Sequence, residues 1–438
     1  MPATLSDIGA GIGFALLLTP GLCPAQTAAT GAWSLHGQTT AVEEWHYGFP
    51  SPYQGLESLQ GAEEDKHTLS ATLFLGRRLW EGAEIYIDPE VTQGAGLSGT
   101  QGIAGFPNGE ATHASGNSPS YDTARLFIRQ TIGLGGETES LGDDENQFAG
   151  VQDVDRVVLT AGRLAATDVF DDNAYSHDPR TQFLNVALMD SGAWDFPADT
   201  KGYTGGFTAQ LNRKSWALGY GAFMEPAEAN GSVLDKRLLE AWGQILQWDR
   251  RYSWGAHAGT VRCFAFLNRA DMGSYAGAVD DPAADLNVIK TRSYRCKEGV
   301  GLSWDQELVP SLGAFARLSW SDGRTETWAF TEIDSSAAAG LSLQGAAWAR
   351  KNDTLGLAGV VDGLSSEHRH YLAAGGYDFS IGDGRLAYAA EEIAECYYAW
   401  QPFPSFSLSA DYQFVANPAY NSSRGPVSVF GFRAHCSF

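Results

Sequence analysis

The sequence is poor in charged residues, in proline and in cysteine. Only 18% of its 438 residues are charged, whereas soluble domains average about a quarter. There are 17 prolines and 5 cysteines, and the 29 basic residues are outnumbered by 52 acidic ones, for a net charge of −23. Nucleic-acid binding needs a basic footprint, so nucleic acid is not expected as a partner.

Long apolar runs are also missing. No segment approaches the roughly 18 apolar residues of a membrane-spanning helix, so none is predicted. The short apolar run at residues 8–18, IGAGIGFALLL, is followed by Cys-Pro-Ala at 23–25. We interpret residues 1–25 as a signal peptide cleaved after Ala25, although its first residues carry no Lys or Arg. Residues 26–438 would then form the mature protein.

The sequence is rich in glycine and aromatic residues, and its apolar and polar residues alternate along many segments. It contains 51 Gly, 13 Trp, 17 Tyr and 22 Phe, which suits a β-rich protein with tight turns. Apolar and polar residues alternate along many segments, among them 66–79 and 311–320. The final segment, PVSVFGFRAHCSF, places Phe430 to Phe438 on one face and Arg433 on the other. A closing strand of this kind that ends in Phe is typical of outer-membrane β-barrels.

Two features favour a barrel in lipid over a soluble β-sandwich. The apolar faces begin or end in Trp and Tyr, as an interfacial girdle requires. The polar faces carry Arg, Glu and Asp, which are costly in a packed core but natural in a water-filled lumen. We therefore predict an all-β transmembrane antiparallel β-barrel with short periplasmic turns and long extracellular loops.

The alternation gives seventeen candidate strands, but a barrel with both ends in the periplasm needs an even number, and we predict sixteen. The candidates are 33–42, 66–79, 82–92, 123–134, 156–164, 203–211, 215–224, 237–248, 252–266, 290–304, 311–320, 336–349, 353–361, 369–381, 384–398, 406–416 and 426–438. Short turns are expected at 80–82, 212–214, 249–251 and 382–384. Long loops are expected at 93–122, 165–202 and 268–290.

An ordered set of segments resembles the carbohydrate-selective porins of the bacterial outer membrane. The segments are 72–111 (TLFLGRRLWEGAEIYIDPEVTQGAGLSGTQGIAGFPNGEA), 124–137 (ARLFIRQTIGLGGE), 168–185 (DVFDDNAYSHDPRTQFLN), 369–386 (RHYLAAGGYDFSIGDGRL) and 411–427 (DYQFVANPAYNSSRGPV). The resemblance implies a sixteen-stranded barrel that passes monosaccharides and other small neutral sugars by facilitated diffusion. It implies no chemical reaction and no cofactor, and it leaves open whether the barrel is a monomer or a trimer.

Two other functions stay open at this point. One is a non-specific or cation-preferring porin, to which the acidic composition would contribute. The other, of a different class, is a secreted soluble β-protein that binds or acts on glycans. Glu391 and Glu395 share a face of their predicted strand, but nothing in the sequence sets them apart as a catalytic pair.

A sugar channel needs hydrogen-bonding groups and flat aromatic faces, with binding weak enough for release. The predicted strands after residue 65 supply a lumen-facing set with these properties. The candidates are Arg78, Glu84, Tyr86, Asp88, Glu90, Arg125 and Arg129. They could equally be ion pairs that brace the wall. Similarly, the loop 93–122 could fold into the pore and narrow it, or stay a solvated outer loop.

Cysteine and histidine offer weaker signals. Cys263 and Cys296 lie on either side of the loop near 268–290 and could form a cross-strand disulfide in an oxidising periplasm; otherwise they are free thiols that face lipid. His368 and His370, two positions apart, could share a metal, but we interpret them as isolated surface residues. No metal site is predicted.

Overall fold

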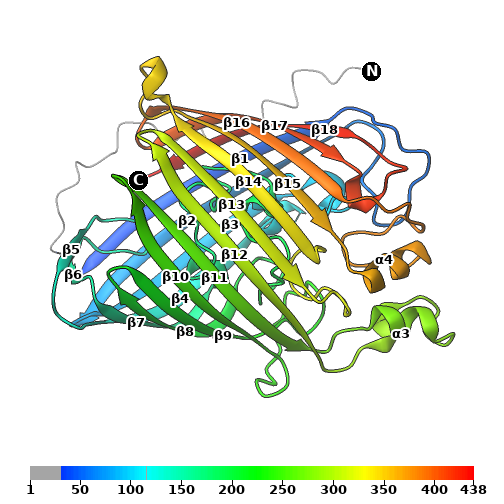
Figure 1. Ribbon diagram of the computed structural model, residues 1–438, viewed down its shortest axis with the longest axis horizontal. Coiled ribbons are helices and arrows are strands. Elements are labelled where there is room, and N and C mark those ends of the chain that lie inside the picture. The colour runs from blue at the N-terminus through cyan, green and yellow to red at the C-terminus, as the bar shows by residue number, and fades with distance from the viewer. Residues whose placement is uncertain (1–30, 115) are drawn as a thin grey trace.

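The computed structural model describes residues 31–438 apart from residue 115, so the predicted signal peptide lies outside the described residues. Sixteen strands in this part form one closed antiparallel barrel, in which β1 pairs with β18 (Figure 1). The predicted strand number is confirmed. The barrel strands are β1 (Trp33–His46), β2 (Glu64–Trp80), β3 (Ala83–Gly94), β4 (Gly116–Gly133), β7 (Arg156–Leu164), β8 (Thr204–Arg213), β9 (Trp216–Phe223), β10 (Trp242–Trp254), β11 (His257–Ala270), β12 (Arg295–Val309), β13 (Leu312–Ser321), β14 (Ser335–Gln344), β15 (Thr354–Gly363), β16 (Glu391–Phe403), β17 (Phe406–Ala416) and β18 (Val427–Ser437).

The barrel wall is apolar outside and polar inside. On β2, Leu73 is 45% exposed whereas the adjacent Thr72 is 2% exposed, and on β18 Phe432 is 42% exposed whereas Arg433 is 1% exposed. A soluble β-sandwich would bury the apolar face between its sheets, so this polarity argues against one. Among the described residues, no helix has the length and apolar character needed to cross a membrane.

The two ends of the barrel differ in their connections. Short turns lie at the end where β1 starts and β18 finishes, as at residues 81–82, where Gly82 has a positive φ of 71°. Long connections lie at the other end, where Figure 1 shows α3 and α4. Outer-membrane barrels keep short turns on the periplasmic side. The helices are α2 (Val186–Met189), α3 (Tyr275–Asp280) and α4 (Ser366–Ala373), and the 3₁₀ turns are η1 (Leu97–Gly99), η2 (Gly109–Thr112), η3 (Ala166–Asp168), η4 (Val288–Thr291), η5 (Gly345–Trp348) and η6 (Pro418–Tyr420).

Of the seventeen candidate strands, the one at 369–381 does not form. This part of the chain holds α4 and the loop after it, so the short turn expected at 382–384 also belongs to a long outer connection. Ser365 caps α4 by accepting a hydrogen bond from the backbone N–H of His368 at 3.0 Å. The same fold buries His368 completely. The interpretation of His368 as an isolated surface residue is therefore wrong.

A second predicted turn is also misplaced. Residues 249–251 lie within β10, which continues to Trp254. The chain reverses only at Gly255, which has a positive φ of 64°. Three consecutive charged residues suggested a turn, but at the end of a barrel strand such residues reach water while their backbone remains paired.

One periplasmic connection is long. Residues 134–155, called the periplasmic segment below, contain the hairpin of β5 (Thr138–Leu141) and β6 (Gly150–Asp153), which Figure 1 shows at the end of the barrel opposite α3 and α4. Phe148 of this segment is buried and lies against Tyr86 of β3, with ring centroids 5.9 Å apart. The rule of short periplasmic turns therefore has an exception here.

The candidate disulfide is not formed, because Cys263 and Cys296 are free and exposed. The register explains this: on the paired strands β11 and β12, Cys263 lies opposite Leu302 and Cys296 lies opposite Arg269. An offset of six residues along a strand is roughly 20 Å, whereas disulfide-linked Cα atoms lie within about 7 Å. Placement on either side of a loop did not fix the register of the two strands.

Candidate pore and its constriction

Two long connections fold back into the barrel. They are residues 95–114, the β3–β4 loop, and residues 165–203, the β7–β8 loop. Ile103 of the first and Phe183 of the second are both buried in the largest apolar cluster of the described chain. The predicted loop at 93–122 therefore folds into the pore instead of staying a solvated outer loop.

Lumen-facing carboxylates of β16 hold both loops by their backbones. Glu391 accepts a hydrogen bond from the N–H of Gly105 at 2.7 Å, and Glu395 accepts one from the N–H of Leu184 at 2.6 Å. Both glutamates are fully buried. Burying a carboxylate is costly unless it is hydrogen-bonded, and the loop backbones meet that need. Their shared face thus serves to anchor loops.

Two buried arginines hold the β7–β8 loop from neighbouring parts of the wall. Arg317 of β13 donates to the backbone oxygens of Leu188 at 2.7 Å and Ser176 at 2.6 Å. Arg433 of β18 donates to the backbone oxygen of Gln182 at 2.8 Å. Hydrogen bonds from charged donors contribute about 1.5–3 kcal/mol each, so these contacts keep a long loop in one position inside the lumen.

Two of the seven predicted lumen residues, Arg125 and Glu90, contact the β7–β8 loop. Arg125 donates from Nε to Oδ2 of Asp168 at 2.7 Å, and its Nη1 lies 3.8 Å from Oδ2 of Asp88. Glu90 accepts from the hydroxyl of Tyr203 at 3.2 Å. Asp88 and Glu90 are almost fully buried. Arg125 and Glu90 connect the wall to the loop, whereas Asp88 accepts a hydrogen bond from the side chain of Asn146 in the periplasmic segment at 2.8 Å.

Like Asp88, the other four lie beside the periplasmic segment. Arg78 donates to the backbone oxygen of Ala149 at 2.7 Å, and Arg129 donates to that of Asn146 at 2.8 Å. The Tyr86 hydroxyl donates to Glu84 at 2.7 Å. All seven predicted residues thus face the barrel interior, and each contacts another part of the chain there.

A charged cluster joins the two loops to the wall. Arg180 of the β7–β8 loop lies with Nε 2.9 Å from Oε1 of Glu110 in the β3–β4 loop, and with Nη2 3.4 Å from Oε2 of Glu90. We call these three residues the Arg180 cluster. Sequence reasoning missed Arg180 and Glu110, because alternation identifies the faces of strands but cannot tell which loop residues enter a lumen.

Titratable groups of the periplasmic segment and the β7–β8 loop influence one another. Burial, and then the negative charge of Asp178, raise the pKa of Glu145 to about 7. Burial would raise the pKa of Asp178 too, but Arg180 and a backbone N–H hold it below its ordinary value. Near neutral pH, Glu145 is therefore the group of this pair whose charge changes.

One cavity lies on each side of the β3–β4 and β7–β8 loops. The inner cavity, at the periplasmic end, has a volume of about 350 Å³, within the usual range of small-molecule sites. The outer cavity has a volume of about 260 Å³. The inner cavity is lined by side chains that include Tyr175, Thr181, Gln182, Glu307, Ser342, Gln401 and His435. The outer cavity is lined by side chains that include Gln101, Phe106, Ala111, Thr112, Asn230, Phe330 and Thr331.

The lining of the inner cavity combines amides, hydroxyls and aromatic rings. Tyr175 belongs to the β7–β8 loop and packs on Gly313 of β13. A Cβ at residue 313 would lie 2.1 Å from the Tyr175 ring, so glycine is needed for the ring to pack this closely against the wall. None of the seven residues predicted from the strands lines either cavity.

A closed barrel with an apolar exterior and loops folded into a polar lumen defines an outer-membrane channel. Residues 57–438 match the family model of the carbohydrate-selective porins, the OprB family, and the chain belongs to that family. It is a sugar-selective porin of the bacterial outer membrane, and both its family and its fold are those of a channel rather than an enzyme.

Solved structures agree with this fold. A high-pH structure of Pseudomonas putida OprB is 14% identical, with 93% of this chain and 94% of that chain covered and a TM-score of 0.69. The low-pH structure of the same protein is 12% identical, with 93% of each chain covered and a TM-score of 0.51. No curated protein sequence matches this chain.

Proposed function

We propose that small neutral sugars diffuse passively from the outer cavity to the inner cavity past the Arg180 cluster. One observation carries this proposal. Glu110 is followed in the sequence by Ala111 and Thr112, which line the outer cavity, and Arg180 is followed by Thr181 and Gln182, which line the inner one. The ion pair between Glu110 and Arg180 therefore lies where the two cavities approach each other.

The chemistry of this junction suits a neutral, hydroxyl-rich solute. Arg180 lies between Glu90 and Glu110, so its positive charge is already paired with carboxylates and an anion gains little there. An arginine that faces carboxylates still has hydrogen-bonding capacity to exchange with a hydroxyl. Tyr175 offers an aromatic surface in the inner cavity. Such contacts are weak enough to release the sugar again.

Three further parts of the proposal follow from the same reasoning. The seven strand residues named from the sequence act on the sugar path by positioning the loops and the periplasmic segment. The exposed apolar band of the wall contacts outer-membrane lipid. The protein binds its sugars without changing them chemically.

Liposome swelling with the purified protein tests selectivity. Neutral monosaccharides are expected to enter faster than charged solutes of equal size. Equal rates would instead indicate a non-specific porin, and faster entry of cations would indicate a cation-preferring one. Either result would contradict the proposal.

A pair of tyrosine variants tests the path itself. Tyr175→Phe removes the hydroxyl and Tyr175→Leu removes the aromatic ring, and each is expected to weaken sugar block of the ion current by about two- to tenfold, the equivalent of one hydrogen bond. Tyr121→Leu is the matched control, because Tyr121 on β4 is 68% exposed on the barrel exterior. Unchanged sugar block in both Tyr175 variants would remove the inner cavity from the path.

A further inference from the structure

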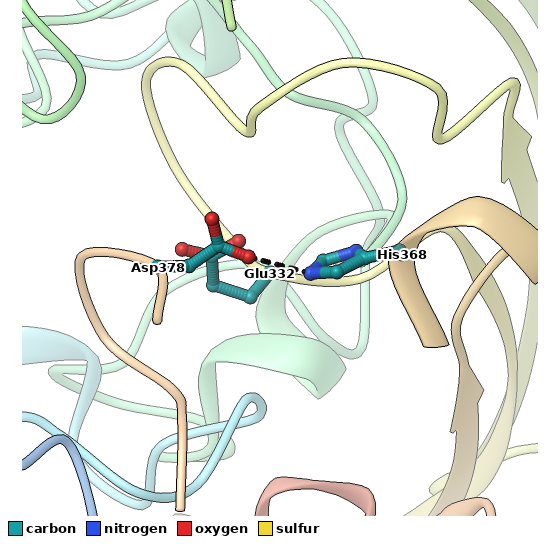
Figure 2. Close-up of side chains that lie close together, drawn as sticks. All are labelled: Glu332, His368 and Asp378. Carbon is teal, nitrogen blue, oxygen red and sulfur yellow. Dashed lines mark hydrogen bonds and ion pairs between the residues drawn. The ribbon is translucent and has the colours of Figure 1, made fainter. Parts of the chain in front are cut away.

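Three side chains from two outer connections converge outside the pore. Glu332 belongs to the connection between β13 and β14, His368 lies on α4, and Asp378 follows that helix. Their ligand atoms lie within 4.8 Å of one another, and all three residues are buried (Figure 2). Figure 2 shows the two carboxylates lying close together on the same side of the imidazole, with Asp378 joined to His368 by the dashed line. Carboxylate oxygens and imidazole nitrogens are common metal ligands.

The unpaired carboxylate of Glu332 is a second observation, separate from the clustering, that indicates a missing ligand. Its side chain is 0% exposed, and neither carboxylate oxygen has a hydrogen-bond partner among the described residues. Oδ1 of Asp378 is likewise buried without a partner. A buried carboxylate without hydrogen bonds is strongly unfavourable. Lys297, the buried lysine of this region, is paired with Asp195 at 3.1 Å and does not supply the missing partner.

The imidazole of His368 is held in the orientation of a metal ligand. Its Nδ1 lies 3.0 Å from Oδ2 of Asp334, and that oxygen also accepts a hydrogen bond from the backbone N–H of Ser365 at 2.8 Å. Its Nε2 faces Oδ2 of Asp378 at 2.7 Å. Histidines that bind metals commonly donate their second N–H to a carboxylate in this way. Tyr275 of α3 stacks on the ring with centroids 4.2 Å apart and fixes its plane.

We propose that Glu332, His368 and Asp378 bind a divalent cation through one imidazole nitrogen and two carboxylates, with Asp334 as the residue that orients His368. This mixed donor set suits Zn²⁺ or Mn²⁺. Ca²⁺ and Mg²⁺ favour oxygen ligands alone. Binding would place a positive charge against the unpartnered carboxylate oxygens.

The position of the site gives it a structural role at the pore entrance. Phe330 and Thr331, just before Glu332, line the outer cavity, and so do Phe379 and Ser380, just after Asp378. A cation bound here would link the two connections that supply these lining residues. The site therefore clamps the outer mouth of the channel without lying in the sugar path.

The direct test measures metal binding to the full protein, purified in detergent with any affinity tag removed. After treatment with EDTA and dialysis, titration with Zn²⁺ or Mn²⁺ is followed by calorimetry and elemental analysis. We expect one cation per chain, with little competition from equal concentrations of Ca²⁺ or Mg²⁺. The absence of stoichiometric binding of both Zn²⁺ and Mn²⁺ by the unaltered protein would overturn the proposal.

Variants then assign the ligands. Glu332→Gln and Asp378→Asn keep side-chain size and are each expected to weaken binding by about tenfold or more, an effect at least as large as that of losing an outer-shell partner. Glu225→Gln is the matched control, because Glu225 is also a fully buried glutamate of an outer connection with two unpartnered oxygens. Gel mobility without heating verifies that each barrel is folded. Unchanged affinity in both folded ligand variants would place the cation elsewhere and overturn the assignment.

Discussion

Arg125 on β4 and Asp168 in the β7–β8 loop form a two-point ion pair. Nε of Arg125 donates to Oδ2 at 2.7 Å, and Nη2 donates to Oδ1 at 2.5 Å. Both side chains are largely shielded from solvent, at 16% and 26% exposed. The pair joins the wall to the loop that carries Arg180, so the position of the Arg180 cluster depends on it.

Replacing Arg125 by methionine is expected to loosen the β7–β8 loop. The change removes charge-assisted hydrogen bonds that contribute about 1.5–3 kcal/mol each, and it leaves Asp168 without its partner. Single-channel recordings should show higher mean conductance and larger current fluctuations. Arg213→Met is the control, because Arg213 pairs with Asp155 at 2.9 Å at the periplasmic rim, away from this loop. Identical currents from the two variants would contradict the anchoring role of Arg125.

Arg78→Ala and Arg129→Ala are expected to raise conductance and to weaken sugar block. Each arginine donates one hydrogen bond to the backbone of the periplasmic segment, at 2.7 Å and 2.8 Å respectively. Losing both should release the segment more completely than losing either one, so the double variant should show the largest conductance. Arg77→Ala provides the comparison, because Arg77 is the neighbour of Arg78 on β2 and lies over the Trp33 ring instead. If sugar block is unchanged in Arg78→Ala, in Arg129→Ala and in the double variant, Arg78 and Arg129 do not influence the path.

The preference of the channel for cations should rise with pH around neutrality. Glu145 has a pKa of about 7, raised by burial and by Asp178 and Asp144, and opposed by Arg180 and Arg125. Below that pH the side chain is neutral, and above it a negative charge is added beside the lumen. Because the folded pKa exceeds that of an unfolded glutamate, docking of the segment should weaken as pH rises from about 4.5 to 7.

Reversal potentials across a KCl gradient between pH 5 and pH 9 measure this change. Glu145→Gln should remove the step near pH 7. Glu139→Gln should retain it, because Glu139 lies in the same segment with its side chain 44% exposed. A step of the same size in the Glu145 variant would assign the titration to another group.

Cys263 and Cys296 should behave as two free thiols at the lipid-facing surface. Both are exposed, and their register keeps them apart. A reducing agent is therefore expected to leave the gel mobility of the folded and heated protein unchanged. Mass spectrometry after alkylation in detergent should find both side chains modified without prior reduction. Protection of both residues that is lost only after reduction would indicate a disulfide.

The alternation predicted strands well because it is a local signal. Residues 66–79 are apolar on alternate positions, and β2 exposes Leu73 while it buries Thr72. The same signal failed at 369–381, where Ser365 before the segment and Gly375 within it were the signs of a capped helix. Helix capping is also local, so this error could have been avoided from the sequence.

The contacts that hold the loops inside the barrel could not have been predicted in the same way. Glu391 and Glu395 bind backbone N–H groups of Gly105 and Leu184, which lie 286 and 211 positions away in the sequence. A carboxylate on a strand has the same appearance in the sequence whether it faces water or a loop. The Arg180 cluster likewise unites a strand and two loops whose meeting no spacing encodes.

The sequence by itself determined the barrel, its polarity and its family. Each strand carries its own pattern of alternating side chains, and lipid outside and water inside select the same faces throughout, down to the closing strand with Arg433 inside and Phe438 outside. Only the tertiary structure decided what fills the lumen and what meets at the outer mouth. Those arrangements depend on buried charges that find partners from distant segments, as Arg317, Glu395 and His368 do. Such pairings exist only once the barrel has closed and brought its loops together.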